Sequence, residues 1–260
     1  MDIEVGIIGG TRGMGKWFAD YLRERGFRLH VTGSKGEIPL EEITSRSHVV
    51  VVSVPIDVTE EVIARVGPLM KEEALLMDLT SLKVGPVAAM LKFSTSEVIG
   101  GHPLFGPNTA MFEDRRFVLC PARTEKWLPW LKSVLTAGGI HCVETTPERH
   151  DEMMALVQGL NHLNNMMMGL VLSRRVSSLK ELEDYATPLF AAKMALVKKV
   201  LQESPRLYAE ILCKNPYIEE IVGLYSDMLD WFSLLIREGR GEELRSLLEK
   251  AAQNLWPPSP

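Results

Sequence analysis

The run Ile3-Glu4-Val5-Gly6-Ile7-Ile8, followed at once by Gly9-Gly10-Thr11-Arg12-Gly13-Met14-Gly15, decides the fold of this chain. The first run is short and almost wholly apolar, as in a buried strand, and the second is too rich in glycine to continue it. From Lys16 to Arg25 large apolar residues recur at helical spacing, and Gly26 follows where a helix would end. A further strand-like run follows at Arg28–Thr32. This order of strand, glycine-rich turn, helix and strand is typical of a dinucleotide-binding βαβ unit.

The glycine-rich turn predicts a site for the phosphates of a dinucleotide. Glycines let the backbone approach a pyrophosphate closely, and the free N–H groups at the start of the next helix attract its negative charge. Counting back from Gly15, the middle glycine of a GxGxxG pattern is replaced by Arg12, so the loop departs from the standard form. We expect cofactor contacts from Gly9, Gly10, Thr11, Arg12, Gly13, Met14 and Gly15.

The end of the second predicted strand bears on the choice between the two nicotinamide cofactors. An NAD site usually has an acidic residue there, which binds the ribose 2′-hydroxyl. This chain has Thr32-Gly33-Ser34-Lys35 and no carboxylate before Glu37. Ser34 and Lys35, with Arg12, could bind a 2′-phosphate through charge-assisted hydrogen bonds. The sequence therefore predicts NADP as the cofactor; NAD remains the alternative if Ser34 and Lys35 form only a polar turn.

Strands and helices continue to alternate as far as Pro147. Apolar or β-branched runs lie at 49–54, 74–79, 96–101, 117–121 and 140–143. Helical patterns separate them at 57–66, where Asp57 is the expected N-cap, at 83–91 and at 125–136. The alternation predicts an α/β domain over residues 1–147, built on a doubly wound parallel sheet of the Rossmann type.

Ligands of such sheets bind where the strands end, so residues that follow strands are candidate site residues. His102 is the most informative of them. It lies in Gly100-Gly101-His102-Pro103-Leu104-Phe105-Gly106-Pro107, and this density of Gly and Pro predicts a rigid loop directly after the strand at 96–101. A histidine in a tight turn is often incidental, but this expected position favours a functional role. The other candidates at the same edge are Ser53, Val54, Pro55, Thr80 and Ser81.

The second half of the chain is predicted to be helical. From Glu148 to Val176 it is largely apolar, and Gln158, Asn161, His162 and Asn165 fall at the spacing of one helix face. We call these four residues the polar stripe. The other faces, with Leu156, Val157 and the run 166–168 of methionines, are expected to be buried in the core or in a dimer, so that the stripe lines a polar cleft. Further helical patterns predict an all-α domain over 148–255 and a proline-rich tail at 256–260.

Composition narrows the class of protein. The formal net charge is -5 and the pI is about 5.8, which gives no electrostatic case for nucleic acid binding. No apolar run is long enough to span a bilayer, and the first residues are not a secretory signal. The three cysteines are widely separated, with no CxxC, and no metal-ligand spacing is found. We expect a cytoplasmic enzyme or ligand-binding protein without a metal ion.

Four motifs, in order along nearly the whole chain, resemble those of the prephenate dehydrogenase family. The run from Gly100 to Pro107 looks like the family's histidine motif, and Asp78-Leu79-Thr80-Ser81-Leu82-Lys83 is similar to its DxxSxK segment. Arg149-His150-Asp151, followed by 158–162, resembles the opening of its helical domain. Thr187-Pro188-Leu189-Phe190 looks like a later segment of that domain.

The resemblance implies oxidative decarboxylation of prephenate to 4-hydroxyphenylpyruvate in tyrosine biosynthesis, with NADP or NAD as hydride acceptor. It implies that His102 is a neutral base that accepts a hydrogen bond from the C4 hydroxyl, and that Ser81 holds this hydroxyl or orients His102. His162 and the rest of the polar stripe (Gln158, Asn161, Asn165) would meet the substrate from the helical side. The family is commonly dimeric through its helical domain, so a homodimer is expected.

One departure from the family concerns the substrate carboxylates. Many members have an arginine just after the Thr-Pro-x-aromatic segment, where this chain has Ala191, Ala192 and then Lys193. Lysine does not reproduce the bidentate fork of arginine. Either Lys193 or another cation (Arg206, Arg174 or Arg175) takes this role, or the substrate is arogenate, whose side chain carries an amine. The family also allows a fused mutase or dehydratase domain beyond Pro260.

Two other kinds of protein are compatible with the N-terminal half. One is another NADP-linked oxidoreductase, similar to β-hydroxyacid dehydrogenases or to deazaflavin-linked NADP reductases, but neither explains the histidine motif. The other is a non-catalytic NADP sensor, which would bind nucleotide without turnover and would leave Ser81, His102 and His162 without a role.

Overall fold

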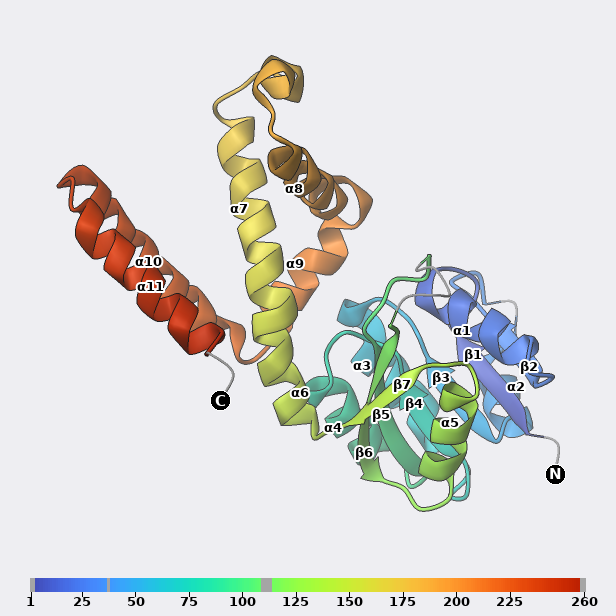
Figure 1. Ribbon diagram of the computed structural model, residues 1–260. Coiled ribbons are helices and arrows are strands. Elements are labelled where there is room, and N and C mark those ends of the chain that lie inside the picture. The colour runs from blue at the N-terminus through green and yellow to red at the C-terminus, as the bar shows by residue number, and fades with distance from the viewer. Residues whose placement is uncertain (1–2, 37, 109–113, 258–260) are drawn as a thin grey trace. The chain divides into compact units, whose positions relative to one another are not determined.

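A seven-stranded sheet forms the N-terminal half of the chain in the computed structural model (Figure 1), which describes residues 3–36, 38–108 and 114–257. Its strand order is β2-β1-β3-β4-β5-β6-β7. The strands are β1 (Glu4–Ile8), β2 (Arg28–Thr32), β3 (Val49–Val52), β4 (Leu75–Asp78), β5 (Glu97–Pro103), β6 (Arg116–Arg123) and β7 (His141–Glu144). The prediction of a doubly wound α/β sheet is confirmed.

The direction of the last two strands differs from the prediction. Neighbouring strands from β2 to β5 pair in parallel, but β6 pairs with β5 in antiparallel fashion and β7 runs parallel to β6. A parallel neighbour needs a crossover connection, usually with a helix, and no helix is found among the described residues between Pro103 and Arg116. The expectation of a wholly parallel sheet is therefore wrong for β6 and β7.

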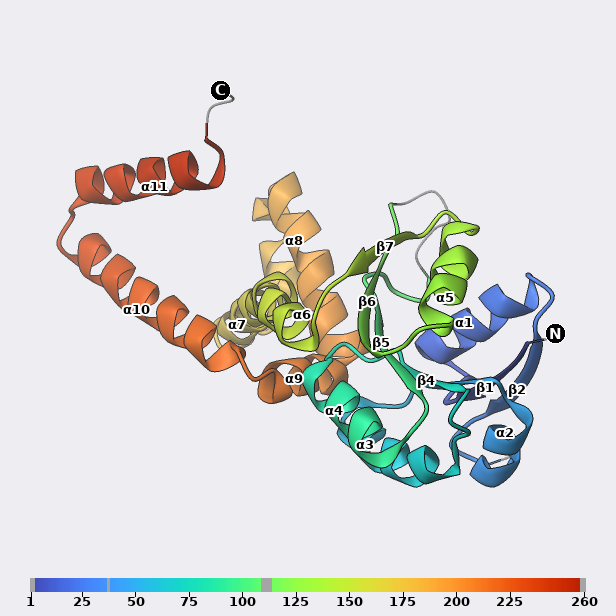
Figure 2. The same cartoon turned by 90° about the horizontal axis from the view of Figure 1, so that it is seen from below.

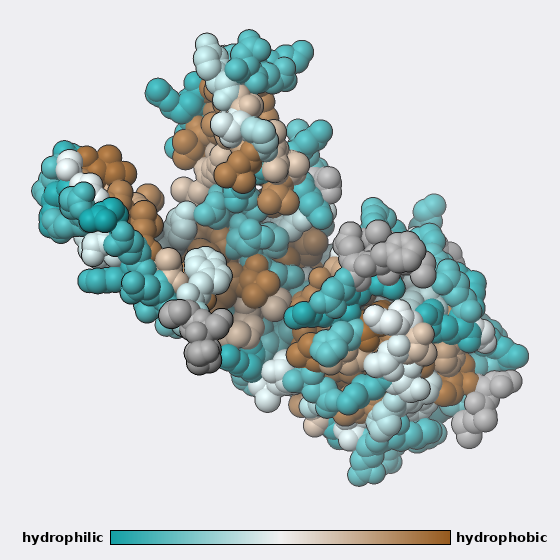
Figure 3. Space-filling model, viewed as in Figure 1, coloured by the Kyte–Doolittle hydropathy of each residue, from teal (hydrophilic) through white to brown (hydrophobic). Residues whose placement is uncertain are grey.

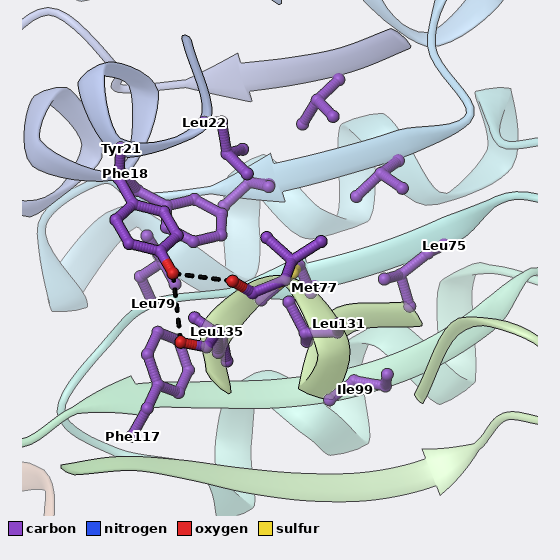
Figure 4. Packing of buried hydrophobic residues seen from close by; sticks show 14 of the residues in the cluster. Phe18, Tyr21, Leu22, Leu75, Met77, Leu79, Ile99, Phe117, Leu131 and Leu135 are labelled. Carbon is purple, nitrogen blue, oxygen red and sulfur yellow. Dashed lines mark hydrogen bonds between the residues drawn. The ribbon is translucent and has the colours of Figure 1, made fainter. Parts of the chain in front are cut away.

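Helices cover both faces of the sheet (Figure 2). One face carries α1 (Gly13–Arg23) and α5 (Trp127–Thr136), and the other carries α2 (Leu40–Arg46), α3 (Ile56–Val66) and α4 (Val84–Phe93). On the first face Phe18 and Leu22 pack with Leu131 and Leu135 over the strands (Figure 4). The Tyr21 hydroxyl donates to the Val134 carbonyl oxygen at 2.7 Å, which joins α1 to α5. Each fully buried apolar side chain of this size stabilises the fold by about 1.5–3 kcal/mol.

The carboxyl ends of the five parallel strands lie level with one another. Thr32 pairs with Ile8, Ile8 with Val52, Val52 with Asp78, and Asp78 with Gly100. The segments that follow these residues therefore start from a single edge of the sheet. Such an edge is where doubly wound sheets bind their ligands.

His102 lies inside β5, so the predicted strand continues past Gly101 and the expectation of a loop at His102 and Pro103 is wrong. Its strand partner is Val118 of β6. The two preceding glycines serve close packing rather than a turn: a Cβ on Gly100 would lie 2.6 Å from Val87 Cγ2, and one on Gly101 would lie 2.7 Å from the Asp78 carbonyl oxygen. Glycine here allows neighbouring elements to approach β5, and the strand continues through them.

The start of α3 also differs from the prediction. The N-cap is Pro55, and Asp57 lies in the first turn of the helix instead of capping it. The Asp57 carboxylate forms an ion pair with Arg206, a residue of α9 (Pro205–Lys214). Asp57 thus helps to join the nucleotide-binding half to the helices that follow.

All described elements after β7 are helical. They are α6 (Pro147–Met154), a π-helical turn (Ala155–Leu160), α7 (Asn161–Ser173), a 3-10 helix (Leu179–Tyr185), α8 (Pro188–Lys198), a second π-helical turn (Lys199–Glu203), α9, α10 (Ile218–Arg237) and α11 (Gly241–Leu255). The chain divides into two compact units, Met1–Pro216 and Tyr217–Pro260. The predicted boundary at 147/148 thus coincides with the end of the strands and lies within the first unit. Residues 258–260 of the predicted tail lie outside the described part.

The helical half exposes much apolar surface. Val157 is 62% exposed and Leu156 43%, so of the two settings expected for these side chains, the core of the chain does not hold them; Val171 is 56% exposed as well. Figure 3 shows apolar side chains at the surface of the helices that follow the sheet. Apolar faces of this extent are typical of an interface. Within the described residues, no helix combines the length and the apolar character that a membrane span requires.

Candidate active site

The glycine-rich turn packs tightly against the ends of β2 and β3. The N–H groups of Gly9 and Gly10 both donate to the Thr32 carbonyl oxygen, at 2.8 and 3.1 Å. Gly9 has φ +84°, and a Cβ there would lie 2.1 Å from the Ser53 carbonyl oxygen. A Cβ on Gly15 would lie 2.4 Å from the carbonyl oxygen of Gly9. Both positions therefore require glycine, and Ser53 is part of the same closely packed turn.

The region around the start of α1 fits the phosphates of a dinucleotide. The helix begins at Gly13 with no side-chain cap and no acidic residue in its first turn. Gly13 has φ +57°, and the space that its Cβ would occupy is open to 4 Å. The N–H groups of the first turn can therefore reach an anion directly. Arg12 is exposed at the N-cap, beside this open space.

The other predicted cofactor contacts lie on the surface near this edge. Ser34 and Lys35 form an exposed turn directly after β2, and within the described residues Lys35 forms no ion pair. Val54 is half-buried and Pro55 exposed. The fit to a dinucleotide thus comes from the packing of the turn and from an uncapped helix start, with two cations, Arg12 and Lys35, free to approach phosphate groups.

A buried ion pair holds the strand that carries His102. Lys83 and Asp78 are both fully buried and form a short ion pair. The Lys83 ammonium also donates to the Gly101 carbonyl oxygen at 2.7 Å, and the Gly101 N–H faces the Asp78 carboxylate at 3.4 Å. The residue directly before His102 is therefore bonded through both its backbone groups to this pair.

Thr80, a predicted cofactor contact, belongs to the same buried network. Its N–H donates to the Asp78 carboxylate at 2.9 Å, and its hydroxyl bonds to the same carboxylate and to the Leu82 carbonyl oxygen. These groups leave no free donor on Thr80. Ser81, the next residue, is half-buried, and its hydroxyl makes no hydrogen bond within the described part of the chain. Of the two residues, Ser81 has the available side chain.

His102 is joined by hydrogen bonds to two residues of the helical half. His102 Nδ1 lies 2.8 Å from His150 Nε2, and His150 Nδ1 lies 2.6 Å from Asp151 Oδ1. All three side chains are buried, with His102 3% exposed. Asp151 also accepts the N–H groups of Lys83 and Val84 at 2.8 and 2.9 Å, at the start of α4. Strand β5, helix α4 and helix α6 therefore meet at this series of groups.

Burial favours the neutral form of both histidines. Burial lowers the pKa of His102 well below its ordinary value of 6.5, and the nearby His150 and Lys83 lower it further. Burial likewise lowers the pKa of His150, against the opposing effect of its hydrogen bond with Asp151. A neutral imidazole has one nitrogen that can accept a proton, as a general base requires.

The structure brings only part of the polar stripe to His102. Gln158 Nε2 lies 3.4 Å from His102 Nε2, and Gln158 Oε1, His162 Nδ1 and Asn165 Oδ1 are buried without a hydrogen-bond partner among the described residues. Burial lowers the pKa of His162, whose ring packs on Tyr208 at 4.4 Å. Asn161 is exposed, because the π-helical turn at 155–160 shifts the phase of the helix that the prediction assumed to be regular. Buried polar atoms without partners indicate a place for a polar ligand.

The four cations that could bind the substrate carboxylates differ in their burial and in whether an acidic residue pairs with them. Lys193 is half-buried on α8 and forms no ion pair with a described residue. Arg206 is engaged by Asp57. Arg174 and Arg175 lie exposed after the end of α7. Among these candidates Lys193 is the half-buried one.

Sequence reasoning missed three members of this site, Lys83, His150 and Asp151. In the sequence these residues are visible only as parts of family motifs. Their contacts join residues 48 or 68 positions apart, and no local pattern reveals such contacts. A signal was nevertheless present. Adjacent His and Asp residues shortly before the polar stripe, and a Lys five residues after an Asp at a strand end, are unusual at positions that the pattern makes buried.

Two family models match most of the chain. Residues 23–144 match the family model described as prephenate dehydrogenase, nucleotide-binding domain, and residues 146–250 match that described as prephenate dehydrogenase, dimerization domain. The chain is 34% identical over 272 residues to a probable arogenate/prephenate dehydrogenase of Methanocaldococcus jannaschii, covering 97% of this chain and 61% of the relative. It is 32% identical to the T-protein of Haemophilus influenzae, covering 90% and 63%. The chain thus spans less than two thirds of the length of these relatives.

Solved structures show the same fold. A prephenate dehydrogenase from A. aeolicus, in complex with hydroxyphenyl propionate and NAD+, superposes with a TM-score of 0.76 at 21% identity, over 97% of this chain and 96% of that one. An arogenate dehydrogenase from Synechocystis gives a TM-score of 0.72 at 22% identity, over 97% and 98%.

Proposed function

The chain belongs to the prephenate dehydrogenase family, and from this premise we propose that it oxidises and decarboxylates prephenate to 4-hydroxyphenylpyruvate with a nicotinamide dinucleotide. The observation that carries the proposal is the buried His102 on β5, whose Nε2 lies 3.4 Å from Gln158, a residue whose Oε1 is buried without a partner among the described residues. A protein that only senses NADP has no need for such a buried base.

In this mechanism His102 accepts the proton of the substrate's C4 hydroxyl at Nε2. As the C4–O bond becomes a carbonyl, the C4–H bond breaks with its electron pair; a nicotinamide held at the glycine-rich turn would supply the hydride acceptor. The bond from the ring to its carboxylate then breaks as CO₂, its electrons make the ring aromatic, and the C4 oxygen recovers the proton from His102, so the residues mainly align and polarise the substrate. Ser81, whose hydroxyl is free within the described part, would donate to or accept from the C4 oxygen. Gln158 would leave His102 Nε2 for the substrate when it enters.

Arogenate is the second candidate substrate, and a specific observation favours it. The unpartnered atoms include two amide oxygens, Gln158 Oε1 and Asn165 Oδ1, which accept hydrogen bonds. Amide oxygens of this kind suit the ammonium group that arogenate carries where prephenate has a keto oxygen, because a keto oxygen can itself only accept a hydrogen bond.

The two substrates can be separated by one assay. Purified protein is mixed with prephenate or arogenate and each nicotinamide cofactor, and the absorbance of the reduced nicotinamide is followed while the product is identified by mass. Formation of 4-hydroxyphenylpyruvate supports the first proposal, and formation of tyrosine supports arogenate as substrate. Absence of turnover on both substrates with both cofactors would contradict the proposed function.

We infer that NADP is the preferred cofactor, with Lys35 as a ligand of its 2′-phosphate. Hydrogen bonds to charged groups contribute about 1.5–3 kcal/mol, so Lys35→Ala should lower kcat/KM for NADP by roughly 10–100-fold and leave that for NAD nearly unchanged. Lys71→Ala, at another exposed lysine, is the matched control and should change neither value. A wild-type preference for NAD, or equal losses for both cofactors in Lys35→Ala, would overturn this assignment.

We also propose that the chain forms a homodimer through its helical half. The support is the match to a dimerization-domain model over 146–250 and the exposed apolar side chains of that region. Leu156, Val157, Leu170 and Val171 lie within one helical stretch and are each more than a third exposed. Their burial against a second copy would account for an apolar surface that water otherwise contacts.

A further inference from the structure

Asp151 and His150 carry a role that no family motif assigns to them. We propose that they are positioning residues that fix the tautomer of His102, so that its lone pair lies on Nε2, the nitrogen that faces the polar stripe. The inference deepens the proposed function and rests on it in one respect, the use of His102 as the proton acceptor. The orientation of the three groups can be established without substrate.

The argument begins at Asp151, whose carboxylate can only accept. Its two oxygens receive the N–H groups of Lys83 and Val84 at the first turn of α4, and Oδ1 also lies 2.6 Å from His150 Nδ1. A carboxylate at a helix N-terminus is stabilised in its charged form. The proton between the carboxylate and the ring therefore belongs to His150 Nδ1.

The tautomer of His150 then determines that of His102. A neutral imidazole has one N–H, so His150 with a proton on Nδ1 has a lone pair on Nε2. That nitrogen lies 2.8 Å from His102 Nδ1, which must therefore be the donor. The remaining nitrogen, His102 Nε2, is left as the acceptor. Gln158 Nε2, an amide donor 3.4 Å away, faces it, as this assignment requires.

The backbone holds this series of groups in place from several sides. Asn215 donates to the Asp151 carbonyl oxygen at 2.8 Å, which ties the last turn of α6 to the segment that follows α9. Lys83 binds Asp151 through its N–H and Gly101 through its ammonium, so one residue locates both ends of the series. The rings of His102 and His150 meet edge to face, with centroids 5.0 Å apart. Little freedom remains for either ring to rotate.

Few charged groups surround His102. Their arrangement leaves the ring neutral at rest and stabilises it when Nε2 takes up the substrate proton. Lys83, the N-cap of α4, and its partner Asp78 of β4 both bond to Gly101. His150 and Asp151 come from α6, and the neutral Gln158 comes from the π-helical turn. When His102 gains a proton at Nε2, its Nδ1–H stays donated to His150 and the His150 Nδ1–H to Asp151. The carboxylate thus stabilises the cation through two hydrogen bonds, as the buried Asp of a catalytic triad does through one.

Nitrogen NMR of protein labelled with ¹⁵N in histidine measures the tautomers directly. The six histidines can be assigned by single substitution, with His141→Gln, at an exposed ring, as the control that should leave the other signals unchanged. In the wild type we expect a protonated Nδ1 and an unprotonated Nε2 for both His102 and His150. The opposite tautomer of His102 would overturn the proposal, whatever the enzyme's substrate.

Asp151→Asn tests whether Asp151 determines the tautomer of His102 through His150. The Asn oxygen can still accept a backbone N–H of α4, and its amide group would donate to His150 Nδ1, which would reverse the tautomers of His150 and then of His102. We expect the His102 signals to exchange their types and kcat to fall by roughly 10²-fold, with KM little changed. Unchanged His102 signals would contradict the proposal. If this variant does not fold, the wild-type spectrum still decides, and His150→Phe, which removes the link, should leave His102 as a mixture of tautomers.

Failure of the positioning role and failure of the proposed function give different results. If the chain does not oxidise prephenate or arogenate, the tautomer measurement is unaffected. If the chain is active but His102 is protonated on Nε2, the dehydrogenase proposal survives and the role of Asp151 and His150 does not.

Discussion

His102→Asn should lower kcat by roughly 10²–10⁴, the range expected for loss of a general base, while the protein still binds cofactor. The Asn side chain is smaller than imidazole and can keep a hydrogen bond to His150, but its amide cannot take up the proton of the C4 hydroxyl. His102 is buried, its ring is hydrogen-bonded to His150, and Lys83 binds the carbonyl oxygen of the preceding Gly101, so the effect should be on turnover more than on KM. Steady-state kinetics with the preferred substrate measure it.

The control for this variant is His141→Gln, which changes an exposed histidine at the start of β7. It should keep wild-type kcat. Thermal unfolding of both variants must remain cooperative, so that a loss of activity in His102→Asn is not a loss of fold. A kcat within a few-fold of wild type, in a folded His102→Asn protein, would mean that His102 is structural and that another group accepts the proton.

Lys83→Met should lower the free energy of unfolding by about 3–5 kcal/mol, because it leaves the Asp78 carboxylate buried without its partner. Both side chains are fully buried, and Lys83 Nζ also binds the Gly101 carbonyl oxygen. Replacing both residues, in Asp78→Leu with Lys83→Met, removes the uncompensated charge and should cost less than Lys83→Met alone. Urea denaturation of the wild type and the variants gives the three values.

Lys16→Ala is the control for this comparison, since Lys16 pairs with Asp20 at the surface of α1. An exposed ion pair of this kind contributes little to the free energy of unfolding, so this variant should unfold at the same urea concentration as the wild type. If Lys83→Met also unfolded with the wild type, or if the double replacement were the more destabilising change, the buried pair would not be what holds β4, α4 and β5 together.

The first βαβ unit could be predicted from sequence because each of its signals is local. The apolar strand, the glycine-rich turn and the amphipathic helix follow one another, and Gly9 and Gly15 are required by contacts within the same unit. The level carboxyl ends of the strands follow from the alternation of strands and helices alone. For these reasons the sequence predicts that His102 lies at the same edge of the sheet as the glycine-rich turn.

The remainder depended on contacts between distant residues. Gly100 and Gly101 signal a turn when read locally, but they serve the approach of Val87 and Asp78, which the sequence does not reveal. The polar stripe assumed a regular helix, and the π-helical turn moved Asn161 to the surface. The link from His102 through His150 to Asp151 spans both halves of the chain and has no periodicity from which to predict it.

The pH dependence of kcat/KM tests most directly the claim that a neutral His102 accepts the substrate proton. Burial and the adjacent His150 and Lys83 place the pKa of His102 well below 6.5 in the folded protein. As pH falls, the base therefore stays unprotonated through 6.5, and activity is lost only when pH nears the lowered pKa. We predict an acid limb of kcat/KM well below pH 6.5 in the wild type, and its absence from the residual activity of His102→Asn. An acid limb at or above 6.5, or the same limb in both proteins, would contradict this account.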